Sequence, residues 1–180
     1  MKLLGENATL NNIAINITSD DVCVDGFTIE ADNITSAIIV DNASDVDIVN
    51  NVLNVVGEAD KDAYAILANK ADSLNISGNT VNYEGNTNGT ALNNAVLISE
   101  SKDVVVNDNV FNITVPSCYV PWAEVPAGSG NWVSSPVSEG LVFDNCDNLE
   151  LSENDIAVNY NGGGHGRASG ATVYSLKEMK

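Results

Sequence analysis

The stretch DVDIVNNVLNV, from Asp45 to Val55, decides the fold. Apolar residues alternate with polar ones on both sides of an asparagine pair, a pattern typical of two short strands joined by a sharp turn. It returns three times, as SLNISGNTVNY from Ser73, DVVVNDNVFNI from Asp103 and NLELSENDIAV from Asn148. Internal repeats of about 30 residues are typical of a solenoid.

A third short apolar segment precedes each of these corners. These segments are residues 37–40, 64–67, 95–98 and 140–143, and residues 170–174 begin one more. Three strands in each repeat leave no room for a helix, and equivalent strands of successive repeats stack in parallel about 4.8 Å apart. The sequence therefore predicts an all-β fold, a right-handed single-stranded parallel β-helix of about six to seven coils. Residues 1–19 are expected to form an incomplete first coil.

One asparagine recurs at the turn of each corner. We expect these residues to adopt the left-handed conformation that a sharp bend requires, because asparagine tolerates it better than most residues. Their stacked amides are also expected to hydrogen-bond along the column. The predicted structural ladder consists of Asn51, Asn79, Asn109 and Asn154.

Composition limits the partners. The 180 residues include 25 acidic and 7 basic side chains, which give a formal charge of −18 at pH 7. Nucleic acids, anionic membranes and acidic polysaccharides are therefore poor partners, whereas neutral or basic ligands are not excluded. The acidic run from Glu58 to Asp62 lacks the glycine and the bidentate glutamate of a calcium loop. No metal ion or cofactor is expected.

The three cysteines, Cys23, Cys118 and Cys146, cannot all pair within one chain. A bridge between Cys118 and Cys146 is one possibility. The sequence holds no transmembrane run and no signal peptide, so an export signal would lie outside this chain. Residues 1–180 are expected to form a single domain without capped ends, as in a segment of a longer protein or a protomer that stacks end to end.

Insertions gather at one place in the repeat, after the third strand. They are residues 57–62, 84–93, 116–138 and 160–169, and we expect them to lie along one edge of the solenoid. The longest inserted loop, residues 116–139, carries both tryptophans. Tryptophan offers a flat apolar face to a sugar ring or a partner protein, although these side chains could instead cover the side of the β-helix. The predicted ligand-binding residues are Tyr119, Trp122, Glu124 and Trp132, with His165 and Arg167 on the neighbouring loop.

Two fragments resemble the signature of polygalacturonases, namely Gly164-His165-Gly166 and Asp20-Asp21. The other two triplets of that signature are missing, because Asn79-Thr80 is followed by Val81 and no Arg-Ile-Lys occurs. A glycosidase also needs a pair of carboxylates on either side of the bond, and nothing in the sequence fixes one. The sequence therefore predicts no catalytic residue.

The corners DVDIVNNVLNV and SLNISGNTVNY resemble the pectate-lyase-like right-handed β-helix superfamily. The segment ATLNNIAINITSDDVCVDGFTI, residues 8–29, looks like the adhesin-like surface proteins of methanogenic archaea. This resemblance implies an exported protein at the cell surface. Asn-x-Ser/Thr acceptor sequences, which matter only in an exported protein, occur at Asn7, Asn16, Asn33, Asn42, Asn75, Asn88 and Asn112.

Three functions remain open at this point. The first is a non-catalytic, extracellular adhesin-like module that binds a glycan or a partner protein. The second is a polysaccharide lyase or glycoside hydrolase, which would bring carboxylates and a base together in one groove. The third is a fibre subunit that associates end to end.

Overall fold

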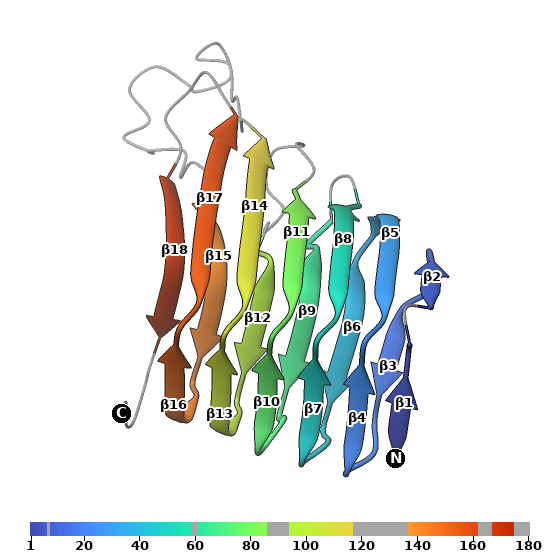
Figure 1. The fold of residues 1–180 in the computed structure, drawn as a ribbon. Coiled ribbons are helices and arrows are strands. Elements are labelled where there is room, and N and C mark those ends of the chain that lie inside the picture. Colours follow the sequence, from blue (N-terminus) through green and yellow to red (C-terminus); the bar gives the residue numbers. More distant parts are fainter. Residues whose placement is uncertain (7, 59–60, 86–93, 117–136, 162–166, 175–180) are drawn as a thin grey trace.

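The computed structural model describes residues 1–6, 8–58, 61–85, 94–116, 137–161 and 167–174. These residues form eighteen strands and no helix (Figure 1). The strands build three parallel sheets of six strands, and each coil contributes one strand to each sheet.

Sheet A contains β1 (Lys2–Leu4), β4 (Val22–Asp25), β7 (Val46–Val49), β10 (Leu74–Ser77), β13 (Lys102–Asn107) and β16 (Asp147–Ser152). Sheet B contains β2 (Thr9–Asn11), β5 (Thr28–Ile34), β8 (Val52–Gly57), β11 (Thr80–Glu84), β14 (Val110–Pro116) and β17 (Asp155–Asn161). Sheet C contains β3 (Ile15–Ile17), β6 (Ser36–Asp41), β9 (Tyr64–Asn69), β12 (Val96–Ser99), β15 (Val137–Asp144) and β18 (Arg167–Tyr174).

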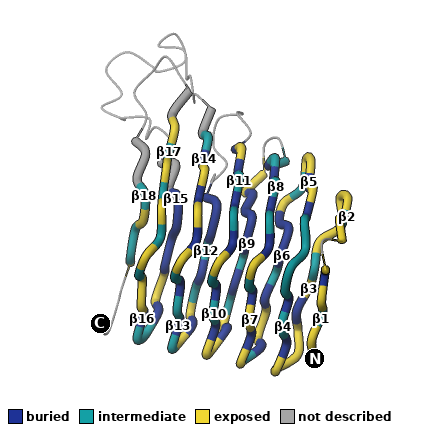
Figure 2. The backbone as a smooth tube through the Cα atoms, viewed as in Figure 1, coloured by how far each residue is buried: buried dark blue, intermediate teal, exposed yellow. Residues whose placement is uncertain are grey.

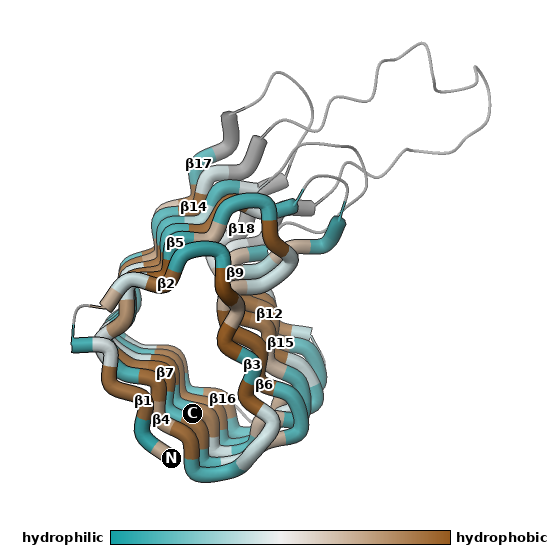
Figure 3. Tube along the Cα trace, turned by 90° about the vertical axis from the view of Figure 1, so that its right-hand side faces the viewer, coloured by the Kyte–Doolittle hydropathy of each residue, from teal (hydrophilic) through white to brown (hydrophobic). Residues whose placement is uncertain are grey.

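The chain runs from sheet A to sheet B to sheet C in each of six coils, which confirms the predicted parallel β-helix. Seen from its N-terminal end, the chain turns clockwise as it recedes, so the β-helix is right-handed (Figure 3). The expectation of an incomplete first coil was wrong. Residues 1–19 supply β1, β2 and β3, which pair with β4, β5 and β6.

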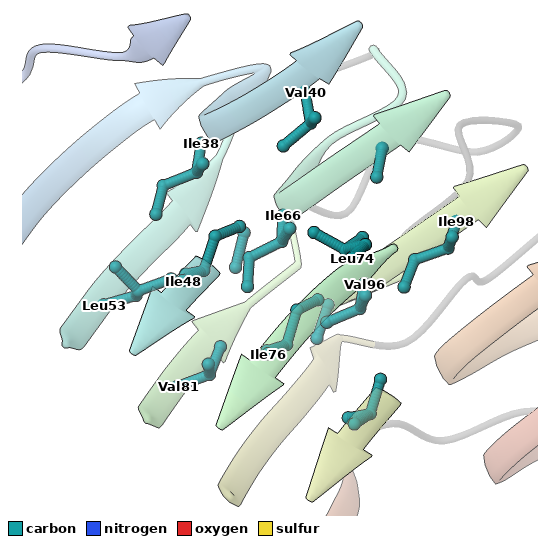
Figure 4. Close-up of a cluster of buried hydrophobic side chains, with 14 of the residues drawn as sticks. Ile38, Val40, Ile48, Leu53, Ile66, Leu74, Ile76, Val81, Val96 and Ile98 are labelled. Carbon is teal, nitrogen blue, oxygen red and sulfur yellow. The ribbon is translucent and has the colours of Figure 1, made fainter. Parts of the chain in front are cut away.

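Inward-facing aliphatic side chains fill the space between the three sheets. Figure 2 marks the buried positions along the strands, and Figure 3 marks the hydrophobic ones. Side chains at the same register position stack from coil to coil, as Ile38, Ile66 and Val96 do on sheet C (Figure 4). All three are completely buried. The alternation of buried and outward residues along β8 and β10 is the period of two that the sequence showed.

The predicted asparagine ladder lies inside the corner that joins sheet A to sheet B. The side-chain amide of Asn51 donates to Oδ1 of Asn79 at 3.1 Å, and that of Asn79 donates to Oδ1 of Asn109 at 3.0 Å. Asn109 continues the ladder to Oδ1 of Asn154 at 2.9 Å. Each Oδ1 also accepts a backbone N–H from the preceding coil. The hydrogen bonds along the column are therefore confirmed.

The ladder asparagines do not supply the left-handed turn, so that expectation was wrong. The positive φ falls on the residue just before each of them: Asn50 (54°), Gly78 (66°), Asp108 (54°) and Glu153 (54°). The bend is thus made by the preceding residue, which can be of several types. The ladder residue itself is fixed as asparagine by its hydrogen bonds, because the corner is buried and its backbone groups need partners.

The corner that joins sheet C to sheet A is filled by small residues. Ala43, Ala71, Ser101 and Cys146 occupy equivalent positions and are all buried. The Ser101 hydroxyl accepts the Ala71 N–H at 2.9 Å and donates to the Ser99 carbonyl at 2.8 Å. At this corner Ser101 and Cys146 contact nearby backbone groups, whereas the opposite corner has a continuous ladder of side-chain amides.

Candidate functional site

The predicted ligand-binding loop lies mostly outside the described residues. Tyr119, Trp122, Glu124, Trp132 and His165 belong to this part of the chain, as does Cys118. Arg167 opens β18, where its backbone is in register with Val137 of β15. The prediction that these side chains bind a ligand stays a prediction.

The predicted placement of the insertions can be followed in the strands that flank them. The connections β8–β9, β11–β12, β14–β15 and β17–β18 all join sheet B to sheet C. The flanking strands extend further than expected, since β14 runs to Pro116 and β15 begins at Val137. These connections therefore leave from one edge of sheet B.

A second amide ladder lies on the outer face of sheet B. The Asn112 amide donates to Oδ1 of Asn82 at 2.9 Å, and the Asn82 amide donates to Oδ1 of Asn54 at 2.7 Å. Asn54 in turn donates to the Glu30 carboxylate at 2.8 Å. The four residues are aligned because their Cα atoms are partners in the parallel register of β5, β8, β11 and β14. We call this row the outer ladder.

The outer ladder has a defined direction and two different ends. Every amide donates toward the N-terminal coils, and the row finishes on Glu30, whose carboxylate accepts a charge-assisted hydrogen bond. At the other end the register partner of Asn112 is Ala157, which has no polar side chain. A chain of hydrogen bonds that ends on a charge is polarised along its length.

The outer ladder forms the floor of an open groove of about 560 Å³. The groove runs from β2 to β14, which at the strand spacing of a sheet is a length of about 19 Å. Its polar lining comprises Asn11, Asn12, Glu30, Asp32, Asn54, Asn82, Glu84, Asn112 and Thr114.

The carboxylates of the groove lie on one face of sheet B. Asp32 and Glu84 are both register partners of Val56, so they stand on the same row, two strands apart. Glu30 lies two residues before Asp32 on β5 and so faces the same side. Among the described residues, these three carboxylates form no ion pair.

Tyr83 lies between Asn82 and Glu84 on β11, and its phenol is buried on the inner face of sheet B. The Tyr83 hydroxyl donates to the Ala63 carbonyl at 2.7 Å. Burial raises the pKa of Tyr83, with smaller contributions from Tyr64 and Asp62. The phenol therefore stays neutral and holds the end of β11 to the segment that leads into β9.

The two described cysteines are free thiols. Cys146 is buried in the corner between sheets C and A, and Cys118, its possible partner in a bridge, lies outside the described residues. Burial raises the pKa of the Cys146 thiol. Cys23 lies on the outer face of sheet A, as its place between Val22 and Val24 suggested.

The described residues contain no group of three or more His, Cys, Asp or Glu side chains able to hold a metal ion. In the same part of the chain, no helix is long and apolar enough to cross a membrane. The chemistry available in the groove is that of amides, hydroxyls and carboxylates, which donate and accept hydrogen bonds.

The sequence carried a signal for the outer ladder that our interpretation missed. Each corner that contributes has an asparagine three residues after the ladder asparagine: Asn54 after Asn51, Asn82 after Asn79 and Asn112 after Asn109. In the fourth corner, Ala157 takes this place. An odd offset in an extended strand puts the two asparagines on opposite faces.

Comparison of the sequence with protein-family profiles, with curated proteins and with solved structures gave no match. The class that the structure itself defines is the parallel β-helix solenoid.

Proposed function

We propose that this protein is a non-catalytic, adhesin-like cell-surface module that binds an extended glycan along the groove on sheet B. One observation carries the proposal. The amides of the outer ladder use only part of their hydrogen-bonding capacity on each other. Within the described residues, Asn54 and Asn82 each donate one amide hydrogen and accept one hydrogen bond, which leaves a donor and an acceptor for a ligand.

The shape of the groove supports a polymeric ligand. The same amide recurs on β8, β11 and β14 at the spacing of adjacent strands, about 4.8 Å. A chain of sugar units offers hydroxyl groups as donors and acceptors at regular intervals, so it can engage several amides at once. A small ligand would use only one or two of them.

The charge of the protein excludes many other polymers. With 25 acidic and 7 basic residues, it repels nucleic acids and acidic polysaccharides. A neutral or basic glycan remains. The resemblance of residues 8–29 to adhesin-like proteins supports the extracellular location, where such glycans occur, and the β-helix would serve as a rigid spacer. The inserted connections leave from the edge of sheet B that borders the groove, since Glu84 and Thr114 line it close to where two of them begin.

The experiment is a glycan-array screen of the wild type beside Asn82→Ala, with protein made in a host without N-glycosylation because Asn112 is an acceptor sequence. The matched control is Asn75→Ala. Asn75 lies in the same coil on the outer face of sheet A, where its amide donates to Asp47 at 2.9 Å. We expect Asn82→Ala to weaken binding about threefold to tenfold, the value of one hydrogen bond, and Asn75→Ala to leave it unchanged.

Release of reducing sugar and of unsaturated product is followed in the same wells. Product release would contradict a non-catalytic module and support the lyase or hydrolase. Equal loss of binding in both variants would move the site away from sheet B. Absence of binding to any glycan would overturn the proposal.

A further inference from the structure

The groove is lined by the carboxylates of Glu30, Asp32 and Glu84, which bear on the class of glycan that it binds. We infer that it selects a glycan chain carrying free amino groups over a neutral chain of the same length. This inference rests on the proposed function, because it names the ligand class of the same groove.

The first support is where the carboxylates stand. Asp32 and Glu84 lie on one row of sheet B, about 10 Å apart at the strand spacing, and Glu30 closes the adjacent amide row. A chain lying along the outer ladder would therefore pass carboxylates at its side and at its end. Val56 lies between Asp32 and Glu84 and is half-buried, which leaves an apolar surface beneath a sugar ring.

The second support is that nothing in the described lining neutralises these carboxylates. No lysine, arginine or histidine is among the described residues that line the groove. Each of the four described lysines pairs with an acidic side chain that does not line the groove, and Lys61 does so with Glu58 in the connection that follows β8. Lys2 pairs with Asp25 on sheet A, and Lys70 with Glu100 at the turn after sheet C.

The third support is the direction of the outer ladder. Because each amide donates toward Glu30, the N–H ends of the amides point to the Glu30 carboxylate and their carbonyl oxygens point toward Asn112. The row therefore ends in an anionic acceptor at Glu30 and in the carbonyl oxygen of Asn112 at the other end, and an ammonium group can donate to both. A hydroxyl can be bound by the amides of Asn54 and Asn82 in either direction. An ammonium group gains additionally from Glu30 and Glu84, because hydrogen bonds between ionised partners are stronger than neutral ones.

The test compares an oligomer of β-1,4-linked glucosamine with its N-acetylated counterpart of equal length, by calorimetry at low salt. The pH is mildly acidic, so that the amines are protonated. The variant is the double substitution Glu30→Gln and Glu84→Gln, which keeps one acceptor oxygen at each position and removes two charges. The control is Glu150→Gln, an exposed glutamate on the outer face of sheet A.

We expect the wild type to bind the glucosamine oligomer about threefold to tenfold more tightly than the N-acetylated one, in line with two solvent-exposed charge pairs. The preference should become smaller in the double variant, which keeps Asp32, persist in full in Glu150→Gln and shrink as salt is raised. Circular dichroism of each variant checks that the β-helix is intact.

Three results would overturn the inference. Equal or tighter binding of the N-acetylated oligomer would do so while leaving glycan binding by the groove in place. A preference of undiminished size in the double variant would show that Glu30 and Glu84 do not hold the cation. Binding of neither oligomer would reject the inference, and if the glycan array also showed no binding, the proposed function would fall with it.

Discussion

The protein contains two asparagine ladders, an inner ladder inside the corner that joins sheets A and B and the outer ladder on the outer face of sheet B, and they differ in how completely their amides are used. In the inner ladder, Asn79 donates to Oδ1 of Asn109 and to the Ile48 carbonyl, and its Oδ1 accepts both the side-chain and the backbone N–H of Asn51. In the outer ladder, Asn82 makes one hydrogen bond in each direction. The inner amide is saturated, and the outer amide has capacity left.

The two ladders also differ in how far their asparagines are buried. Asn79 is 1% exposed, so every group that it satisfies would otherwise be buried without a partner. Asn82 faces solvent, and water can replace whatever its neighbours lose. The same residue type, three positions apart, therefore has all its hydrogen-bonding groups used in the fold in one case and keeps a donor and an acceptor on the outer face in the other.

The largest expected effect comes from breaking the inner ladder. Asn79→Ala leaves the Asn51 backbone N–H and one Asn51 amide hydrogen without their acceptor in a buried corner, and it removes the amide that donates to the Ile48 carbonyl. We expect the free energy of unfolding to fall by about 3–5 kcal/mol. Urea unfolding followed by far-UV circular dichroism measures it. The control Asn82→Ala should cost less than about 1 kcal/mol, and equal costs would refute the distinction between the ladders.

A smaller effect is expected at the corner between sheets C and A, where the Ser101 hydroxyl accepts a buried backbone N–H. Ser101→Ala removes the acceptor of the buried Ala71 N–H, so we expect a loss of about 1–2 kcal/mol in the same unfolding assay. Ser99→Ala is the control, because Ser99 is only half-buried and its hydroxyl makes long contacts of 3.2 and 3.4 Å. A larger loss in Ser99→Ala would show that the corner does not depend on this contact.

The inner ladder could be predicted from the sequence, whereas the position of the left-handed residue could not. The period-two alternation and the recurrence of DVDIVNNVLNV identified the sheets, the corners and the inner ladder, because stacking of identical coils turns a sequence repeat directly into a column. The same repeat placed the insertions at one edge. Positive φ at Asn50 rather than Asn51 was not predicted, since aspartate, glycine and glutamate fill that position in other coils.

The outer ladder was missed for a different reason. An outward asparagine in a strand is compatible with a simple solvated face, and only the register shows that Asn54, Asn82 and Asn112 bond to one another. The predicted ligand-binding residues could not be tested in the same way. Most lie in connections whose sequences do not repeat, so the coil register gives no position for them.

Tyr83 and Asn82 offer the same comparison on a single strand, one side chain inside and the next outside. Tyr83→Phe loses the hydrogen bond to the Ala63 carbonyl, which we expect to cost about 1 kcal/mol near pH 7. Because burial raises the pKa of Tyr83, the folded state keeps its proton at a pH where the unfolded state releases it, above about 10. The stability that the folded protein gains by keeping the Tyr83 phenol neutral is complete below the pKa of the unfolded state, and it is lost as the pH rises through the higher pKa of the folded state.

The measurement is the free energy of unfolding of both proteins at neutral pH and at about pH 11. The decrease with pH should be smaller in Tyr83→Phe than in the wild type. An equal decrease in both proteins would mean that the Tyr83 phenol titrates normally in the folded protein, and so that it is not buried on the inner face of sheet B.

The smallest expected effect comes from lengthening the outer ladder. Ala157 is exposed and is the register partner of Asn112, so Ala157→Asn places a fifth polar side chain at the open end of the row. Its amide can donate to Oδ1 of Asn112, which accepts no hydrogen bond from the other described residues. A cross-strand pair of this kind contributes about 0.2–1 kcal/mol, so we expect a gain of that size in the free energy of unfolding.

The affinity of Ala157→Asn for the glycan should rise as well, because the groove gains one more coil of amides. Ala157→Ser, which has a shorter side chain, is the control. If Ala157→Asn increased stability without increasing affinity, the outer ladder would be a second structural column, and the contrast between the two faces would be one of degree.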